Sequence, residues 1–337
     1  MGKGILKMVI FLFVFAISVT LIFSGSAFAY SEEKPMIFKA AIANPSTDIK
    51  AITIKRMGDL VEERTHGRIQ FKYFYGASLI KKPAFMDGVA KGIADISTGP
   101  AAFLTGKMPE LEPFNVFGAY APSKQLEMVK AIRPTLIEAF AKKNIYPVML
   151  QFTGNNIFCH KAKFMKTPAD WKGQKMRASG LFSSKMTKMW GASPVFMPPA
   201  DLYLSLQRGV IDGFLLIYDI VYGLKLFEVA PYITDTALSN TIEPVTMNLE
   251  KWQSLSKEDQ DIFKAVVKEV EPWNFKETLI VVEKIKKDII AKGGKIYELD
   301  EEEKKLYLRD VKTLEPEIAE FSKETGQKFM KILEDYK

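Results

Sequence analysis

The fold of this chain is indicated by two similar stretches, FMDGVAKGIAD at residues 85–95 and YLSLQRGVID at residues 203–212. Each contains a short helical segment, a basic residue, a glycine, an apolar residue and then an aspartate. A glycine in this place is typical of a helix that ends in the left-handed backbone conformation, and the aspartate stands where a short strand begins. The repeated order predicts two similarly built α/β units.

Around the first stretch, strand and helix patterns alternate. Residues 36–43 and 69–74 have the composition of strands, and Ser46 or Thr47 is placed to cap a helix that ends near Arg64. This β-α-β-α-β rhythm predicts a mainly parallel sheet with helices on its faces.

The second unit repeats the alternation, and a helical region follows it. Residues 174–178 form a predicted strand and residues 183–190 a predicted helix. After about residue 248 the chain becomes charged and helical, with Ser256 as the N-cap of one helix. The apolar spacing of residues 306–321 predicts an amphipathic C-terminal helix that packs on a lobe.

The N-terminus has the pattern of a secretory signal. Lys3 and Lys7 precede an apolar run, and Ala27-Phe28-Ala29 matches an A-x-A cleavage site, so we expect residues 1–29 to be removed and Tyr30 to begin the mature chain. The alternative is an uncleaved anchor, but the run is short for a membrane span. This pattern predicts an exported, periplasmic protein.

The charge distribution and the cysteine content argue against a nucleic-acid partner and an internal disulfide. The formal charge of the 337 residues is +7, and loss of two signal-peptide lysines without any acid leaves +5. Basic residues are scattered among acids, so we expect no nucleic-acid partner. Cys159 is the single cysteine, which rules out an internal disulfide within one chain.

The sequence lacks the usual combinations of catalytic residues. Cys159 and His160 are adjacent, so on a strand their side chains point to opposite faces and cannot form a nucleophile–base pair. Asp95 and Asp212 could act as an acid–base pair, but their places after helix ends favour structural hydrogen bonds. With one cysteine and two histidines, we expect no metal site, and we predict neither a cofactor nor an enzyme activity.

Several motifs occur in a fixed order between residues 38 and 234: residues 62–69, 75–79, 92–96, 167–177 (TPADWKGQKMR), 190–195 and 206–213 (LQRGVIDG). Together they resemble the binding subunits of tripartite ATP-independent periplasmic (TRAP) transporters, the DctP-type family. The resemblance implies an α/β periplasmic binding protein fold with two lobes, a hinge, a ligand cleft between the lobes and, in this chain, a helical C-terminal extension.

The resemblance also suggests how the chain divides between the lobes. We expect lobe I to hold residues 30–153 and about 243–282. Lobe II then holds residues 154–242 and about 283–337. Hinge closure on the ligand is the usual device of such proteins.

Arg177 is, by the resemblance, the carboxylate-binding arginine of the family. A planar guanidinium can donate two parallel hydrogen bonds to one carboxylate, which fixes both its position and its orientation. Arg177 also ends a predicted strand, where ligands of open α/β sheets bind. The alternative is an exposed arginine at a strand end.

Other predicted ligand contacts suggest an apolar pocket. Asn155 and Asn156 stand about where relatives that bind sugar acids carry a second arginine, and an apolar segment replaces a polar one after Asp212-Gly213. The remaining candidates are Phe214, Leu216, Tyr218, Phe117, Tyr75, Ser46 and Thr98. Phe214 and Leu216 could equally belong to the core. One arginine among apolar walls suits a monocarboxylate with a hydrophobic or aromatic body.

The expected partners are a small organic acid and the small and large permease subunits of a TRAP transporter, with the chain itself a monomer. Three alternatives stay open at this point: a binding protein of an ABC transporter, the ligand-binding partner of a sensor, and a periplasmic enzyme.

Overall fold

The computed structural model describes residues 34–337, so the predicted signal peptide lies outside the described residues. The strands are β1 (Met36–Ala41), β2 (Ile69–Phe74), β3 (Ile96–Thr98), β4 (Ile145–His160), β5 (Lys175–Ala178), β6 (Ser193–Phe196), β7 (Gly213–Ile217), β8 (Tyr232–Asn248) and β9 (Lys295–Glu298). The α-helices are α2 (Ile49–Arg64), α3 (Phe85–Ala90), α4 (Gln125–Ala141), α5 (Leu181–Met189), α6 (Leu202–Gln207), α7 (Tyr218–Gly223), α8 (Leu249–Gln253), α9 (Lys257–Ala291), α10 (Glu301–Lys312) and α11 (Glu315–Glu334). Short 3-10 helices include η2 (Ala101–Phe103), η3 (Pro109–Asn115) and η4 (Pro122–Lys124).

One sheet links all nine strands, in the order β2-β1-β3-β8-β4-β7-β5-β6, with β9 also paired to β8. In its outer parts the strands run parallel: β1 pairs in parallel with β3, and β5 pairs in parallel with both β6 and β7. Its centre is antiparallel, where β8 pairs with β3 and β4, and β4 pairs with β7. The prediction of a mainly parallel sheet therefore holds for the outer parts and is wrong for the centre.

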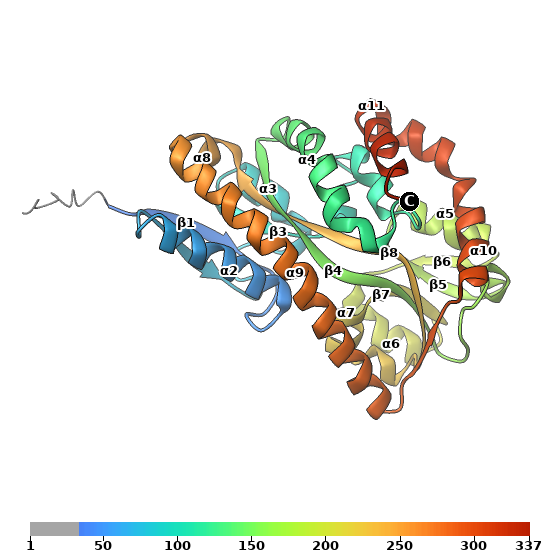
Figure 1. Ribbon diagram of the computed structural model, residues 1–337. Helices are drawn as coiled ribbons and strands as arrows, with labels where there is room; N and C mark the ends of the chain where they lie inside the picture. Colours follow the sequence, from blue (N-terminus) through green and yellow to red (C-terminus); the bar gives the residue numbers. More distant parts are fainter. Residues whose placement is uncertain (1–33) are drawn as a thin grey trace, which may run out of the picture. The chain divides into compact units, whose positions relative to one another are not determined.

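The two long central strands, β4 and β8, connect the outer parts of the sheet (Figure 1). β1 to β3 join one end of this pair and β5 to β7 the other. The pairing of β4 with β8 shifts register between Phe152 and Asn155 and again between Asn155 and Ile157. Gly154 has φ +100° and Ala237 has φ +48°, so both strands bend in this region.

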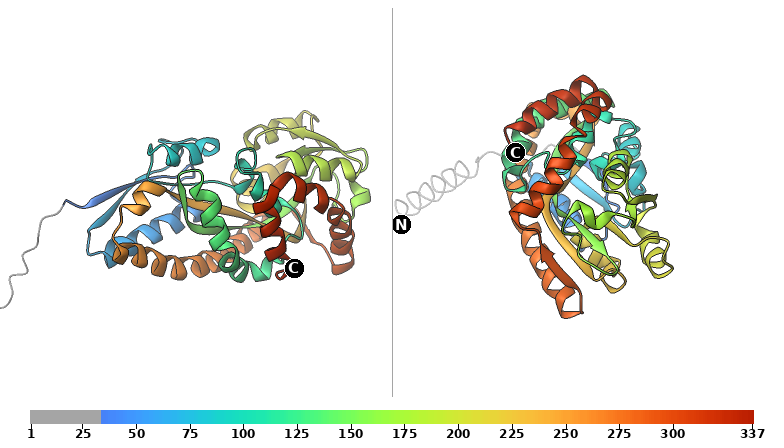
Figure 2. Two further views of the ribbon diagram at one scale, coloured as in Figure 1. Left: turned by 90° about the horizontal axis from the view of Figure 1, so that it is seen from above. Right: turned by 90° about the vertical axis from the view of Figure 1, so that its right-hand side faces the viewer.

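Helices from the C-terminal region pack along both parts of the sheet. The long helix α9 runs beside α2 and along β4 (Figure 2), and Ser256 caps its start as predicted, accepting from the Asp259 N–H. Helix α11 packs on η3 and α4, with the rings of Phe114 and Phe329 5.0 Å apart. Tyr307 of α10 is fully buried among the aromatic side chains of a second cluster. No helix within residues 34–337 has both the length and the apolar character needed to span a membrane.

The two repeated stretches have the predicted backbone. Gly92 and Gly209 both have φ +68°, the left-handed conformation that a glycine adopts without strain. The following aspartates accept hydrogen bonds at 2.7 Å from backbone N–H groups of the neighbouring strand, Asp95 from Lys39 and Asp212 from Lys175. The expected structural role of both carboxylates is confirmed.

The helix cap predicted after β1 is wrong. Asp48, and neither Ser46 nor Thr47, is the N-cap of α2, and its carboxylate accepts from the Lys50 N–H at 2.8 Å. Asp48 can accept in this way because it directly precedes the first helical residue, Ile49, whereas Ser46 lies two residues earlier and is exposed.

Candidate ligand-binding site

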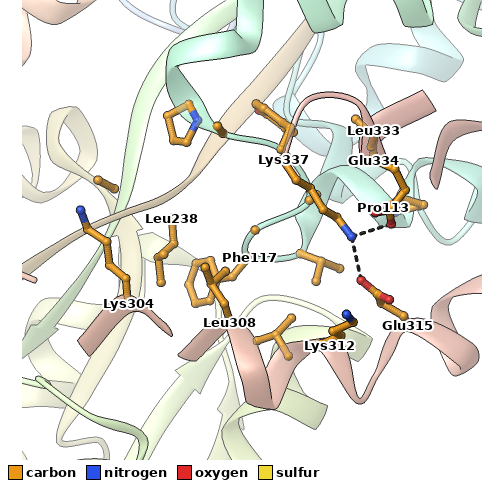
Figure 3. Close-up of a pocket in the computed structure, with 18 of the residues that line it drawn as sticks. Pro113, Phe117, Leu238, Lys304, Leu308, Lys312, Glu315, Leu333, Glu334 and Lys337 are labelled. Carbon is orange, nitrogen blue, oxygen red and sulfur yellow. Dashed lines mark hydrogen bonds and ion pairs between the residues drawn. The ribbon is translucent and has the colours of Figure 1, made fainter. Parts of the chain in front are cut away.

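A hollow of about 560 Å³ lies between α10, α11 and the loop after η3 (Figure 3). Phe117, Leu238 and Leu308 form part of its apolar lining, and Lys337 at its rim pairs with Glu315 and Glu334. Of the ten residues predicted to contact ligand, this hollow holds Phe117 alone. It therefore does not coincide with the predicted site.

A smaller cavity, of about 130 Å³, surrounds Arg177. We call it the Arg177 cavity. Its lining comes mainly from residues 100–115, from the strands β4, β5 and β7, from residues 179–186 after β5, and from Asn240 and Glu243 in the middle of β8. Most of the lining is apolar, including Phe103, Phe114, Leu215, Leu216, Ile217 and Ile220. The sheet thus brings together segments that are more than a hundred residues apart in the sequence.

Arg177 is held in place by backbone carbonyls. Its Nε donates to the Met197 carbonyl at 3.1 Å and its Nη1 to the Leu215 carbonyl at 3.2 Å, and only 7% of the residue is exposed. Burial lowers the pKa of the guanidinium to about 10, which still leaves it charged at neutral pH. Within residues 34–337 no carboxylate pairs with it, and its other N–H groups are left for a ligand. A buried cation without a counter-ion favours an anionic ligand.

The cavity is also lined by polar side chains from β4, β8 and η3. Asn156 donates to the Ser239 hydroxyl at 2.9 Å. Glu243 and Asn240, both of β8, are 1% exposed. Glu112 is also buried, and desolvation raises the pKa of its carboxyl to about 7 against the opposing effect of hydrogen bonds from Thr105 and Asn115. The cavity therefore combines one cation, two acidic groups and apolar walls.

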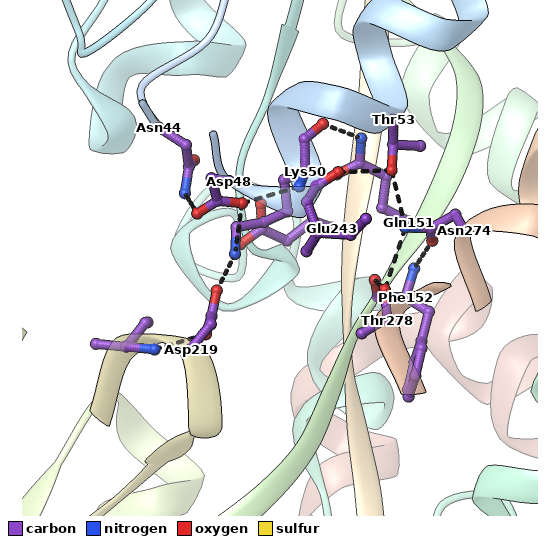
Figure 4. A network of polar contacts seen from close by, with 12 residues as sticks. Asn44, Asp48, Lys50, Thr53, Gln151, Phe152, Asp219, Glu243, Asn274 and Thr278 are labelled. Carbon is purple, nitrogen blue, oxygen red and sulfur yellow. Dashed lines mark hydrogen bonds and ion pairs between the residues drawn. The ribbon is translucent and has the colours of Figure 1, made fainter. Parts of the chain in front are cut away.

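A buried ion-pair network adjoins the cavity (Figure 4). Lys50 at the start of α2 pairs with Asp48 at 3.2 Å and with Asp219 at the start of α7. Burial lowers the pKa of the Lys50 ammonium, but Asp219, Glu243 and Asp48 outweigh this effect and raise it above its ordinary value. The Gln151 amide donates to the Lys50 carbonyl at 3.1 Å. This network connects α2, from the first part of the sheet, to α7, from the second.

The structure brings some of the predicted residues to the Arg177 cavity. Asn156 and Leu216 line it together with Arg177. Asn155, next to Asn156 on β4, does not line it, in keeping with the alternation of side chains along a strand. Phe214 is fully buried in a hydrophobic cluster that also includes Leu216, and it does not line the cavity.

The remaining predicted residues lie away from this cavity. Tyr218 is buried and donates to the Asp235 carboxylate at 3.1 Å. Thr98 is buried and donates to the Pro244 carbonyl at 3.1 Å. The Tyr75 ring stacks on that of Tyr73, with centroids 5.9 Å apart. Ser46 is exposed in the turn before α2.

The polar residues of the cavity that were absent from the sequence prediction include Glu112, Asn240 and Glu243. Glu243 and Asp235 are the two acids of the long strand β8, and an acid within a strand is a signal that could have marked Glu243. Asn240 and Glu112 have no comparable signal, because a 3-10 helix and a polar strand residue are both common at protein surfaces.

Cys159 and His160 form no catalytic pair. Burial raises the pKa of the Cys159 thiol well above its ordinary value. The His160 ring contacts the Gln174 side chain at 3.0 Å, accepts from the backbone N–H groups of Ala162 and Lys163, and has its pKa lowered by burial. Both side chains have structural roles.

A family model described as bacterial extracellular solute-binding protein, family 7 (DctP), matches residues 40–324. The chain belongs to this family. It is 26% identical over 240 residues to the 2,3-diketo-L-gulonate-binding periplasmic protein of Escherichia coli, which covers 70% of this chain and 73% of that protein. It is 28% identical over 219 residues to a monocarboxylate 2-oxoacid-binding periplasmic protein of Nostoc, which covers 62% of this chain and 59% of the relative.

Solved structures confirm the two-lobe fold. An extracytoplasmic solute receptor from Bordetella pertussis that binds pyroglutamic acid superposes with a TM-score of 0.78 at 19% identity, covering 89% of this chain and 99% of that one. Members of the family bind solutes for transport by membrane permeases and are not catalysts. This chain is accordingly a solute receptor of this family, and the predicted absence of enzyme activity follows from its family.

Proposed function

We propose that this protein binds a small organic monocarboxylate with a hydrophobic body in the Arg177 cavity and delivers it to a TRAP membrane permease. The observation that supports this most is the buried guanidinium of Arg177, which has no carboxylate partner within the described residues and faces a small cavity. A ligand carboxylate supplies the missing counter-ion and accepts from its free N–H groups.

The walls of the cavity support an apolar ligand body. Leu215, Leu216 and Ile217 of β7 line it together with Phe103 and Phe114. Hydrocarbon groups placed between them lose contact with water, which contributes about 25 cal/mol for each Å² of apolar surface buried. Two of the relatives are named for acids that they bind, a diketo sugar acid and 2-oxoacids, and this is consistent with a carboxylate ligand here.

Calorimetry on matched ligands tests this proposal. Each small carboxylic acid, such as 4-methylpentanoate, is titrated beside its carboxamide, which has nearly the same shape but no negative charge. We expect the acid to bind at least a hundred-fold more tightly, since the amide leaves the buried guanidinium without a counter-ion. Equal affinity for acid and amide across several pairs would refute a carboxylate site.

We also propose a hinge where β4 and β8 bend, near residues 153–156 and 236–239, close to the boundary expected between the lobes. The Lys50–Asp219 pair then holds the two lobes together in the closed form. Small-angle scattering should show a smaller radius of gyration when ligand is bound. An unchanged profile at proven saturation would contradict hinge closure.

The delivery step implies a mature, monomeric receptor outside the inner membrane. We propose that residues 1–29 are removed on export, which N-terminal sequencing of the protein secreted by its host would test directly.

A further inference from the structure

Two buried acceptors in the Arg177 cavity have no donor. Glu243 Oε2 and Asn240 Oδ1 are both inaccessible to solvent and accept no hydrogen bond from any group that the structure describes within residues 34–337. Both residues line the cavity. A buried acceptor left without a donor costs about 1–3 kcal/mol, and more when it is charged. A ligand that supplies donors would remove this cost.

The surroundings of Glu243 leave Oε2 for such a ligand. The Lys82 ammonium lies 3.4 Å from the other oxygen, Oε1. The nearby Lys50 ammonium already pairs with Asp48 and Asp219. Glu243 Oε1 therefore has the Lys82 ammonium as its partner, whereas Oε2 accepts no hydrogen bond within the described residues.

The orientation of Asn240 is fixed by its own hydrogen bonds. Its Nδ2 donates to the Gln125 side-chain carbonyl at 2.6 Å and to the Pro122 carbonyl at 3.5 Å. This assigns the amide nitrogen to the protein side and leaves Oδ1 as an acceptor. Asn240 and Glu243 thus present acceptors in the same cavity that Arg177 lines with donors.

The charges of the cavity agree with this division. Arg177 brings one positive charge, whereas Glu243 and Glu112 are both acids. A ligand with only a carboxylate neutralises Arg177 but supplies no donor to Glu243 Oε2 or Asn240 Oδ1. A zwitterion adds no net charge and offers an ammonium to the acids and a carboxylate to the guanidinium.

We infer that the ligand is a zwitterionic amino or imino acid with an apolar side chain, whose carboxylate binds Arg177 and whose nitrogen donates to Glu243 and Asn240. The inference rests on the proposed function, because it takes the carboxylate contact with Arg177 as given. It adds a specificity determinant on β8 that selects nitrogen-bearing acids over plain acids of the same shape.

Matched ligand pairs test it by calorimetry on the wild-type protein at pH 7. L-leucine is compared with 4-methylpentanoate, and L-proline with cyclopentanecarboxylate. We expect the nitrogen-bearing member of the better-binding pair to bind at least ten-fold more tightly, because the plain acid leaves both acceptors buried without a donor. Equal or weaker binding of the amino acids overturns the inference, even if the plain acids bind well and support the proposed function.

The Glu243→Gln variant tests whether Glu243 causes the preference for nitrogen-bearing ligands. It should weaken amino-acid binding at least ten-fold and change plain-acid binding by less than about three-fold, since it removes one charge at nearly constant shape. Glu271→Gln, which removes a carboxylate buried away from the cavity beside Arg133, is the matched control and should leave both affinities unchanged.

The outcomes separate the two proposals. An unchanged preference in Glu243→Gln overturns the inference alone. Binding that is equally strong in Arg177→Ala overturns the carboxylate site itself. If no member of either pair binds, both proposals are contradicted for ligands of this size.

Discussion

The two repeated units of this protein share one framework and differ in a single functional position. In the first, the Asp95 N–H donates to the Lys39 carbonyl while its carboxylate accepts from the Lys39 N–H, and the Lys39 ammonium donates to the Gly92 carbonyl. In the second, Asp212, Lys175 and Gly209 make the same three contacts. The strand registers agree as well, with Ala40 opposite Ile96 and Met176 opposite Gly213.

The difference appears two residues after each lysine. That position is Ala41 in the first unit and Arg177 in the second. Ala41 is buried, and its carbonyl accepts from the Ser97 hydroxyl at 2.7 Å. At this position the first unit therefore has a core residue, whereas the second unit has a buried charge that lines a cavity. The framework sets the place, and we propose that Arg177 enables the second unit to bind an anion there.

The largest expected effect is from Arg177→Ala. Loss of one partner of a buried charge pair costs about 2–5 kcal/mol, or roughly 30- to 5,000-fold in affinity. The variant should bind every carboxylate poorly, and Arg177→Lys should restore little because an ammonium lacks the planar fork. Lys175→Ala, two residues earlier on β5 and outside the cavity, is the control that should bind normally in calorimetry.

Asp95→Asn and Asp212→Asn test the shared framework. Each weakens a charge-assisted hydrogen bond, so each should lower the free energy of unfolding by about 1.5–3 kcal/mol in urea titrations at pH 7. Asp212→Asn also removes an ion pair with Lys161, whose ammonium lies 2.6 Å from the carboxylate. A negligible effect in both variants would show that the matched contacts are incidental.

The pH dependence distinguishes the two units. Partial burial raises the pKa of Asp212, but the Lys161 ammonium and the Lys175 N–H outweigh it and hold the pKa below its ordinary value. The stability that Asp212 contributes is therefore present above its unfolded-state pKa of about 3.9 and is lost as the pH falls through the lower folded-state value. Asp212→Asn should flatten the decline in unfolding free energy below about pH 4.

Leu216→Asn should change which acids bind. It places a polar side chain in the apolar wall, so branched aliphatic acids should lose roughly ten-fold in affinity while hydroxylated acids of equal size are spared or favoured. Phe214, two residues earlier on the same strand, is fully buried and does not line the cavity, so Phe214→Leu should affect stability more than ligand preference. Parallel losses for both kinds of acid in Leu216→Asn would place that side chain outside the contact surface.

The smallest effects are expected at the matched glycines. Both have φ +68°, and no atom lies within 4 Å of a Cβ added at either place. Gly92→Ala and Gly209→Ala should each cost about 1 kcal/mol of unfolding free energy, from the left-handed backbone alone. Values that differ by more than about 1 kcal/mol would indicate that the two turns are not equivalent.

Features that depend on near neighbours in the sequence could be predicted. The glycine turns, the hydrogen-bonded aspartates and the Ser256 cap are local arrangements, and the sequence contains every group that makes them. Arg177 could be singled out because it stands in a motif and ends a strand. The cap of α2 could not be assigned in the same way, because the polar residues at positions 46–48 are adjacent and each of them can serve as an N-cap.

Features that depend on distant pairing could not be predicted in the same way. The antiparallel pairing of β4 with β8 joins residues nearly a hundred positions apart, and side-chain periodicity carries no information about which strand pairs with which. That pairing brings Asn240 and Glu243 to the cavity. The polar half of the site therefore became apparent only from the fold.

The most direct test of the central claim is to identify what the protein retains. Wild-type and Arg177→Ala proteins are purified in parallel from cells of the natural host, and the small molecules released on denaturation are quantified by mass spectrometry. We expect close to one equivalent of a single small carboxylic acid from the wild type and almost none from the variant. Retention of an uncharged compound, or of the same acid in equal amount by Arg177→Ala, would contradict the assignment of Arg177 as the carboxylate-binding residue.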